Sequence, residues 1–326
     1  LVGSEMCIRD RHNWLVELRE GLSDKAYALG WAAVKALPGS LSECLFNQAA
    51  DVIARCKDFT QLRRNLARVI GVDGPEEVPD GLVRDSIRSY ARYWREAFCL
   101  PTMNIEERFS ELDISVTGKE HITHALEKGH GVILALPHSG NWDMAGVWLV
   151  QTVGTFTTVA ERLKPESLYQ RFVDYRESLG FDVVPLTGGA VAPMQRLREA
   201  LSHNGVVCLL GERDLRARGV EVVFFGEKTR MPAGPAKLAI DTGAVLCPVH
   251  CWYTSRGWGI RIEEPLDTSR GVEFTTQKLA NVFEKNIAQH PADWHLLQPL
   301  WLKDLSAGHL SHIEEGVKRL EREKDD

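Results

Sequence analysis

The sequence has no run of 18 or more consecutive apolar residues, so it predicts no transmembrane helix. Residues 1–12 also lack the apolar stretch of a signal peptide, and they fit poorly with the sequence that follows. We therefore expect residues 1–12 to be a scar of sequencing or cloning, or a disordered end, and we exclude them from the fold prediction.

Features of several other protein classes are scarce or missing. The formal net charge is −6, which does not favour a nucleic-acid partner. The seven cysteines include no C-x-x-C pair and several stand in apolar runs, which indicates free thiols in a reducing compartment. Cys247, His250 and Cys251 lie in an apolar run with no second ligand pair at zinc-site spacing, so we predict no metal.

Two common active-site motifs are absent as well. Without G-x-S-x-G, the nucleophile turn of an α/β-hydrolase is not predicted, and without G-x-x-x-x-G-K-[ST] a nucleotide phosphate loop is not predicted. The 326 residues, 44% of them hydrophobic, suffice for one large α/β domain or two small ones.

The first third of the chain shows helical spacing of apolar residues. Helices are predicted over residues 25–37, 41–56, 60–70 and 82–98. We expect residues 13–114 to form a helical region that packs on the core and on a membrane surface. Ordinary core packing is the alternative interpretation, but an interfacial position suits four residues near the start, namely Trp14, Lys25, Trp31 and Lys35.

From residue 115 onward, short β-rich runs alternate with helical segments. The predicted strands are residues 131–136, 155–160, 181–186, 206–210, 220–225 and 245–253, and helices are predicted over 144–151, 166–179 and 192–203. This alternation predicts an α/β fold with a central, mostly parallel sheet over residues 115–310. Residues 245–253 and 258–262 should form a hairpin, residues 311–326 a charged tail, and 13–310 one structural domain.

Reactive side chains follow three of the predicted strands. His138, Glu161, Glu212 and Asp214 come directly after the strands that end near residues 136, 160 and 210. Because ligands bind at the carboxyl ends of parallel strands, we expect these residues to meet at one edge of the sheet.

His138 and Asp143 form an H-x-x-x-x-D pattern at a strand-to-helix turn. An imidazole can accept a proton near neutrality, and a carboxylate on its other nitrogen would fix the tautomer. Either Glu212 or Asp143 can supply that carboxylate; we favour Glu212, with Asp143 holding the turn together. The backbone N–H groups after His138 open a helix and are candidates to stabilise an oxyanion.

Asp241 is a further candidate. Pro235 and Gly243 predict the start and end of a helix, which places Asp241 in the last turn, where the helix dipole disfavours an anion. An unfavourable carboxylate suggests a residue that faces a site, and a solvated helix end is the equal alternative.

Several blocks, in order and at matching spacing, give the chain a wider resemblance. GVILALPHSGNWDMAGVW at 131–148 resembles the first motif of the lipid A biosynthesis acyltransferase family. Residues 155–180, GERD at 211–214, residues 224–244 and the Trp294, Gln298, Trp301 pattern resemble its later blocks. SYARYWREAF at 89–98 belongs to the same resemblance, which spans about residues 22–305.

This resemblance implies a glycerol-3-phosphate acyltransferase-like fold and a monotopic enzyme on the cytoplasmic face of the cell membrane. It implies acyl-CoA, with palmitoyl-CoA typical, as donor, and the inositol-linked mannose of a phosphatidylinositol mono- or dimannoside as acceptor. No metal or redox cofactor is implied. His138, Asp143 and Glu212 would be catalytic, and substrate would meet Glu161, Arg176, Arg218 and Asp241.

Three other functions stay open at this point: an acyltransferase for another lipid, a thioesterase-like hydrolase, and a non-catalytic lipid-binding protein. An acyl chain of about sixteen carbons must be shielded from water, since each buried methylene contributes about 0.8 kcal/mol. We therefore expect an apolar tunnel leading from His138, lined by Met144, Val147, Trp148 and Val150.

Overall fold

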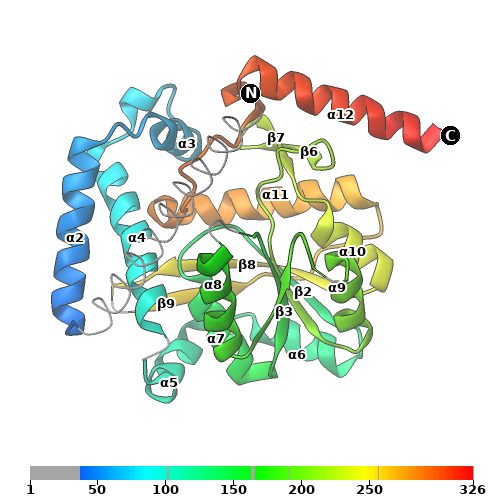
Figure 1. The fold of residues 1–326 in the computed structure, drawn as a ribbon, viewed down its shortest axis with the longest axis horizontal. Helices are drawn as coiled ribbons and strands as arrows, with labels where there is room; N and C mark the ends of the chain where they lie inside the picture. The colour runs from blue at the N-terminus through cyan, green and yellow to red at the C-terminus, as the bar shows by residue number, and fades with distance from the viewer. Residues whose placement is uncertain (1–36, 101–102, 163–165, 190, 256, 326) are drawn as a thin grey trace, which may run out of the picture.

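The computed structural model describes residues 37–100, 103–162, 166–189, 191–255 and 257–325 (Figure 1). The predictions for residues 1–12, for nearly all of the helix at 25–37, and for the interfacial role of Trp14, Lys25, Trp31 and Lys35 lie outside these residues.

A seven-stranded sheet forms the centre of the molecule, with strand order β1-β9-β8-β2-β5-β3-β4. All neighbours pair in parallel except β8 and β9, which form an antiparallel hairpin. The mostly parallel sheet and the hairpin predicted from the sequence are both confirmed. The strands are β1 (Val116–Thr117), β2 (Val132–Leu136), β3 (Phe156–Ala160), β4 (Phe181–Pro185), β5 (Val206–Leu210), β8 (Val245–Tyr253) and β9 (Trp258–Ile262).

Residues 220–225 do not join this sheet, which corrects the sequence-based expectation. β6 (Val220–Phe224) instead pairs with β7 (Glu227–Met231) in a separate antiparallel ribbon. The turn between them is Phe225-Gly226, and both residues have positive φ (49° and 75°), which matches the two-residue turn that suits twisted hairpins. β6 is buried on one face only, against α11 (Val272–Gln289), as expected for a ribbon on the surface of the core.

Helices cover both faces of the central sheet. Successive residues of β2 point to opposite faces: Leu134 and Leu136 join one apolar core, and Ile133 and Ala135 join the other. The first core lies beneath α5 (Ile105–Ser115), α6 (Lys119–Glu127), α7 (Trp142–Val153) and α8 (Glu166–Ser178). The second core lies beneath α11, α9 (Pro193–Ser202) and α10 (Gly234–Thr242). The α/β class is therefore confirmed.

The N-terminal helices pack on the side of this core. α2 (Gly39–Cys56) lies along α4 (Asp80–Cys99), and α3 (Thr60–Ile70) connects them (Figure 1). Asn65 on α3 donates to the carbonyls of Leu296 and Gln298, and Arg68 pairs with Asp304, which ties this region to the C-terminal segment. Short 3₁₀ helices in the described part of the chain include Pro75–Glu77, Pro291–Asp293 and Leu302–Asp304.

The chain closes with α12 (Ala307–Asp325), a charged helix that projects from the body in Figure 1. Among the described residues, no helix combines the length and the apolar character needed to span a membrane.

Candidate active site

The centre of the candidate site lies where β2 and β5 end side by side. The two strands pair in parallel from Val132 and Val206 to Leu136 and Leu210, so the residues that follow them leave the sheet at the same edge. His138 and Glu212 meet there: the Nδ1 atom of His138 lies 2.6 Å from Oε1 of Glu212. The same oxygen accepts the backbone N–H of His138 at 2.7 Å.

The environment of this pair sets the protonation of His138. Glu212 is fully buried, and the His138 side chain is 38% exposed. Burial alone would raise the pKa of Glu212, but the contacts with His138 outweigh it and hold that pKa below 4.5. Since an ionised carboxylate only accepts hydrogen bonds, Nδ1 of His138 must carry the proton, and Nε2 keeps a lone pair.

The pKa of His138 itself is raised above 6.5. Burial acts to lower it, but the charge of Glu212 and its hydrogen bond have the larger combined effect. The nearby guanidinium groups of Arg213 and Arg176 act to lower this pKa too. His138 is therefore a somewhat stronger base than a free imidazole, with its unprotonated nitrogen available to a ligand.

Asp143 does not contact His138. Its carboxylate accepts from Nε of Arg176 at 2.9 Å and from the hydroxyl of Tyr93 at 3.0 Å. Asp143 is 2% exposed, and its partner Arg176 has a side chain that is 19% exposed. Burial and the charge of Asp143 raise the pKa of Tyr93 well above 10, so its phenol stays a donor. The structure thus resolves the alternative left open by the sequence, since Glu212 is the carboxylate that orients the imidazole.

The turn that carries His138, residues 137–143, has little conformational freedom. Gly140 has φ of 60°, and a Cβ there would lie 2.6 Å from the backbone carbon of Cys251. The Ser139 N–H donates to the Pro137 carbonyl and the Gly140 N–H to the Asp293 carbonyl. The N–H groups of Ser139 and Gly140 are therefore already bonded, and the expectation that N–H groups after His138 stabilise an oxyanion stays a prediction for those that open α7.

A cavity lies next to this turn, between the sheet and α7. It encloses about 670 Å³ of empty space, part of it open to solvent. Its lining is mostly apolar, and the charged side chains that the described residues contribute to it, Asp143 and Arg176, form an ion pair with each other. Other lining residues come from β2, α7, β3, β4, β5, β8 and β9, and include Leu134, Trp142, Trp148, Phe156, Phe181, Cys208 and Ile260.

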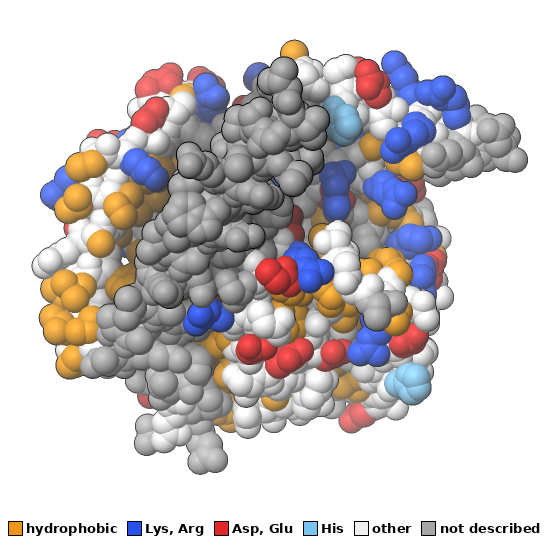
Figure 2. Space-filling model, in the orientation of Figure 1, with side chains coloured by type: hydrophobic (Ala, Val, Ile, Leu, Met, Phe, Trp, Pro, Cys, Tyr) orange, Lys and Arg blue, Asp and Glu red, His pale blue; other side chains and the backbone are white. Residues whose placement is uncertain are grey.

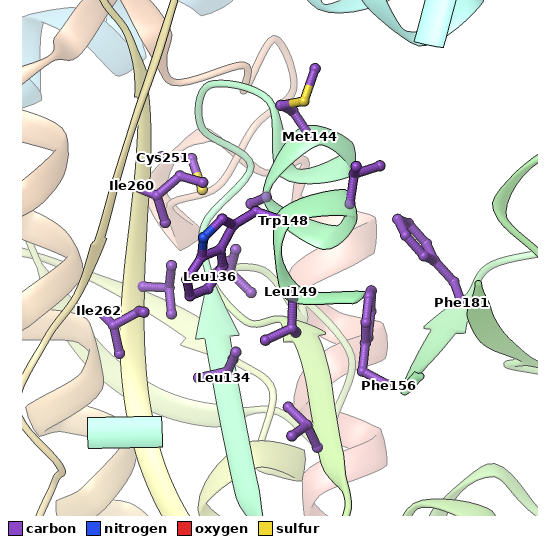
Figure 3. Packing of buried hydrophobic residues seen from close by; sticks show 14 of the residues in the cluster. Leu134, Leu136, Met144, Trp148, Leu149, Phe156, Phe181, Cys251, Ile260 and Ile262 are labelled. Carbon is purple, nitrogen blue, oxygen red and sulfur yellow. The ribbon is translucent and has the colours of Figure 1, made fainter. Parts of the chain in front are cut away.

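The face of α7 that borders the cavity differs in part from the predicted one. Trp148 lines it as expected, whereas the other α7 residues in the lining include Ala145, Gly146 and Leu149. Met144 is buried, but in Figure 3 it points away from Trp148 and Leu149. Met144, Val147 and Val150 belong to the packing of α7 in the first core instead, because helix rotation decides which residues face the cavity.

The remaining candidates lie at different distances from His138. Glu161 follows β3 at the same edge of the sheet and is exposed. Arg218 is also exposed, in the loop after Glu212, and Asp214 in that loop pairs with Arg216. Their placement at this edge agrees with a role toward substrate, which stays a prediction.

Asp241 lies at the opposite edge. It stands in the last turn of α10, as predicted, and α10 leads into Val245, which pairs with Val132 at the start of β2. Its carboxylate binds Arg198 at 2.7 Å and lies 3.5 Å from Lys237. The structure therefore does not bring Asp241 to His138, since the length of β2 separates them.

Sequence reasoning missed three residues near His138 and Asp143, two of them, Tyr93 and His295, from distant parts of the chain. Tyr93 on α4 reaches Asp143, Trp142 packs edge-to-face on the His138 ring at 5.5 Å, and the backbone N–H of His295 donates to the His138 carbonyl. The sequence feature that could have pointed to Tyr93 was its polar hydroxyl on the buried face of a predicted helix. Across the part of the chain that is described, no three His, Cys, Asp or Glu side chains gather as a metal site requires.

Comparison with known proteins agrees with this geometry. Residues 12–303 match the family model described as bacterial lipid A biosynthesis acyltransferase. A phosphatidylinositol mannoside acyltransferase of Mycobacterium tuberculosis (strain CDC 1551 / Oshkosh) is 60% identical over 292 residues, covering 89% of this chain and 92% of the relative. The protein of the same name from Mycolicibacterium smegmatis is 59% identical over 286 residues, covering 87% and 93%. The chain therefore belongs to the bacterial lipid A biosynthesis acyltransferase family and is an acyltransferase.

Proposed function

We propose that this enzyme transfers a palmitoyl-type chain from acyl-CoA to a phosphatidylinositol mannoside, at the primary hydroxyl of the mannose linked to inositol. The observation that carries the proposal is the His138–Glu212 pair, which leaves Nε2 of His138 unprotonated, with the His138 ring packed on Trp142, a residue that lines the apolar cavity. The names of the relatives at about 60% identity support the acceptor.

His138 acts as the general base. Its Nε2 atom removes the proton of the mannose hydroxyl as the oxygen attacks the thioester carbonyl carbon. The tetrahedral intermediate then collapses, the C–S bond breaks, and the imidazolium returns the proton to the leaving sulfur. Glu212 stabilises the imidazolium between these steps. The proton balance closes without a metal or redox cofactor.

The cavity beside α7 receives the acyl chain. Its apolar walls can shield part of the chain from water, and each buried methylene contributes about 0.8 kcal/mol. Arg176 lies in the lining, where its guanidinium can approach the thioester oxygen, while Asp143 holds it in place. Arg218 and Glu161, exposed at the same edge, would meet the polar parts of the substrates.

The enzyme works at the cytoplasmic face of the cell membrane as a peripheral protein. α2 exposes a stripe of large apolar side chains, seen as orange atoms at the left of Figure 2: Leu41, Leu45, Val52 and Ile53. Exposed apolar side chains on an amphipathic helix suit a lipid surface, where both substrates reside.

The test is incubation of the purified protein with palmitoyl-CoA and phosphatidylinositol mono- or dimannoside, followed by mass spectrometry of the lipid. We expect one added acyl group on the inositol-linked mannose, and no product with His138→Ala although the variant folds. Turnover without acceptor would favour the hydrolase, and transfer only to a lysophospholipid or a lipid A precursor would favour another acceptor. Lipid binding without any turnover would contradict the enzyme mechanism.

A further inference from the structure

One face of α4 carries polar residues where an apolar stripe would be expected. Ser89, Tyr93 and Glu96 follow one another at intervals of four and three residues, so they share a face of the helix. All three are buried, with exposed fractions of 7%, 4% and 2%. Buried polar groups cost free energy unless they are hydrogen-bonded, so their partners show what this face does.

Each of the three residues is connected to the turn at 137–143: Tyr93 and Glu96 directly, and Ser89 through two other residues. The Ser89 hydroxyl donates to the Asp293 carboxylate and lies 2.9 Å from Nε2 of His295; the backbones of these two residues bind Gly140 and His138. Tyr93 donates to Asp143, as described above. Glu96 accepts from the side-chain amide of Asn141 at 2.7 Å.

The contact between Glu96 and Asn141 determines how α7 begins. Oδ1 of Asn141 caps α7 by accepting the backbone N–H of Met144 at 2.9 Å. With Oδ1 directed at Met144, the amide nitrogen of Asn141 points away from the cap and donates to Oε2 of Glu96. An amide flipped by 180° would set N–H against N–H at the cap and oxygen against oxygen at Glu96.

Glu96 is held rigidly enough to impose this orientation. Oε2 also accepts the indole N–H of Trp258 at 2.7 Å, and Oε1 accepts from Nε of Arg92 at 2.7 Å. Indole and guanidinium groups are donors only, so these positions need an acceptor at Glu96. Neither the cavity lining nor the contacts of His138 and Glu212 include Glu96, which separates it from the reacting atoms.

We propose that Glu96 is a positioning residue for acyl transfer: through Asn141 it fixes the start of α7, and with it the placement of His138 and Asp143. Tyr93 and Ser89 extend the same support along α4. The inference rests on the proposed function, because His138 is the group being placed. It gives the N-terminal helical region a direct part in the reaction besides packing.

A double-mutant cycle on Glu96 and Asn141 tests the proposal. Asn141→Asp keeps a capping oxygen but sets two carboxylates against each other, and we expect kcat to fall about tenfold or more, with KM for palmitoyl-CoA little changed. The cycle is run in the Trp258→Phe background, because an amide N–H of Glu96→Gln at the Oε2 position would otherwise oppose the indole N–H of Trp258. There an amide N–H can again lie between the two side chains, so adding Asn141→Asp to Glu96→Gln should cost less than about threefold. Additive losses in kcat would overturn the proposal.

Asn141→Ser provides a second variant that should fold, because serine is a good N-cap. It removes the tie to Glu96 and should lower kcat, with KM and the melting temperature near wild type. Wild-type kcat in this variant would contradict the proposal. Glu43→Gln, at an exposed position of α2, is the matched control and should leave kcat, KM and the melting temperature unchanged.

His138→Ala distinguishes the two levels of inference. If His138→Ala keeps wild-type turnover, the proposed function fails whatever the cycle shows. If it abolishes turnover and the cycle is additive, only the role of Glu96 fails.

Discussion

The two edges of the central sheet both carry ion pairs, but in opposite environments. At the carboxyl edge, Glu212 is fully buried against His138, and Asp143 lies beneath the surface with Arg176. At the amino edge, the Asp241 side chain is 29% exposed, and its partners Arg198 and Lys237 are 42% and 52% exposed. Burying a charge costs several kcal/mol unless it is paired, whereas an exposed pair contributes about 0–1 kcal/mol. Buried, paired charge therefore distinguishes the carboxyl edge, where the proposed chemistry lies, from the amino edge.

Among changes at the two edges, neutralising Glu212 should have the largest effect, and that effect is on the rate of acyl transfer. Glu212→Gln keeps the shape of the side chain but removes the charge that stabilises the imidazolium, and we expect kcat to fall by about 10²-fold or more. The measurement is steady-state acyl transfer with palmitoyl-CoA, with a melting curve to show that the variant is folded. Near wild-type rates in both Glu212→Gln and Glu212→Ala would mean that the residue is structural.

The same variant should change the pH profile. Transfer needs neutral His138, so wild-type activity should rise with pH through a pKa above 6.5, because Glu212 raises the pKa of His138. Without the carboxylate, burial lowers that pKa, and the acid limb of kcat/KM should move to lower pH. An acid limb that stays in place would show that another group controls the rate.

Breaking the second buried pair should lower stability, besides removing the support that Asp143 gives to Arg176 at the proposed thioester site. Asp143→Ala leaves Arg176 charged and unpaired, and we expect the free energy of unfolding to fall by about 3–5 kcal/mol. Asp143→Ala combined with Arg176→Leu removes both charges and should lose less. Urea unfolding of the single and double variants measures the difference, and equal losses would show that the pairing does not matter.

A smaller effect is expected at Gly146, on the cavity side of α7. A Cβ there would lie 2.5 Å from the Phe181 ring and 3.0 Å from the Phe156 ring, an aromatic pair whose centroids are 4.6 Å apart. Gly146→Ala should cost about 1–3 kcal/mol of stability and shift preference toward shorter acyl donors. The measurement is kcat/KM across a series of acyl-CoA lengths.

Gly39→Ala serves as the matched control for Gly146→Ala, because no neighbouring atom lies within 4 Å of a Cβ at that position. A uniform fall of kcat/KM at every length would indicate damage to the fold. An unchanged profile would show that this part of the cavity does not measure the acyl chain.

The smallest effect is expected at the amino edge. Asp241→Asn should change the free energy of unfolding by less than about 0.5 kcal/mol and leave the kinetics of transfer unchanged, since its ion pairs are partly exposed and far from His138. A raised KM for the acceptor would show that Asp241 takes part in substrate binding after all.

Much of the fold could be predicted because short, strongly patterned segments decide it. The helix at residues 60–70 and the strand at 206–210 have the predicted bounds. The strand β6 was assigned to the wrong sheet and its partner β7 was not predicted, because periodicity shows that a segment is extended and does not show which strand pairs with it. The cavity side of α7 was predicted only in part, because small changes in helix rotation select different residues.

The sequence by itself determined which side chains leave the sheet at one edge, since the end of a parallel strand is visible as the end of an apolar run. His138 and Glu212 were found in this way. Only the tertiary structure decided that Glu212 contacts His138, that Asp143 pairs with Arg176 and Tyr93, and that Asp241 lies at the far edge. It also brought Glu96 of α4 to Asn141. The physical reason is the separation of the interacting residues along the chain. Strand and helix patterns arise from neighbouring residues, whereas Glu96 and Asn141 are 45 positions apart and His138 and Glu212 are 74 apart, so their hydrogen bonds depend on how whole elements pack.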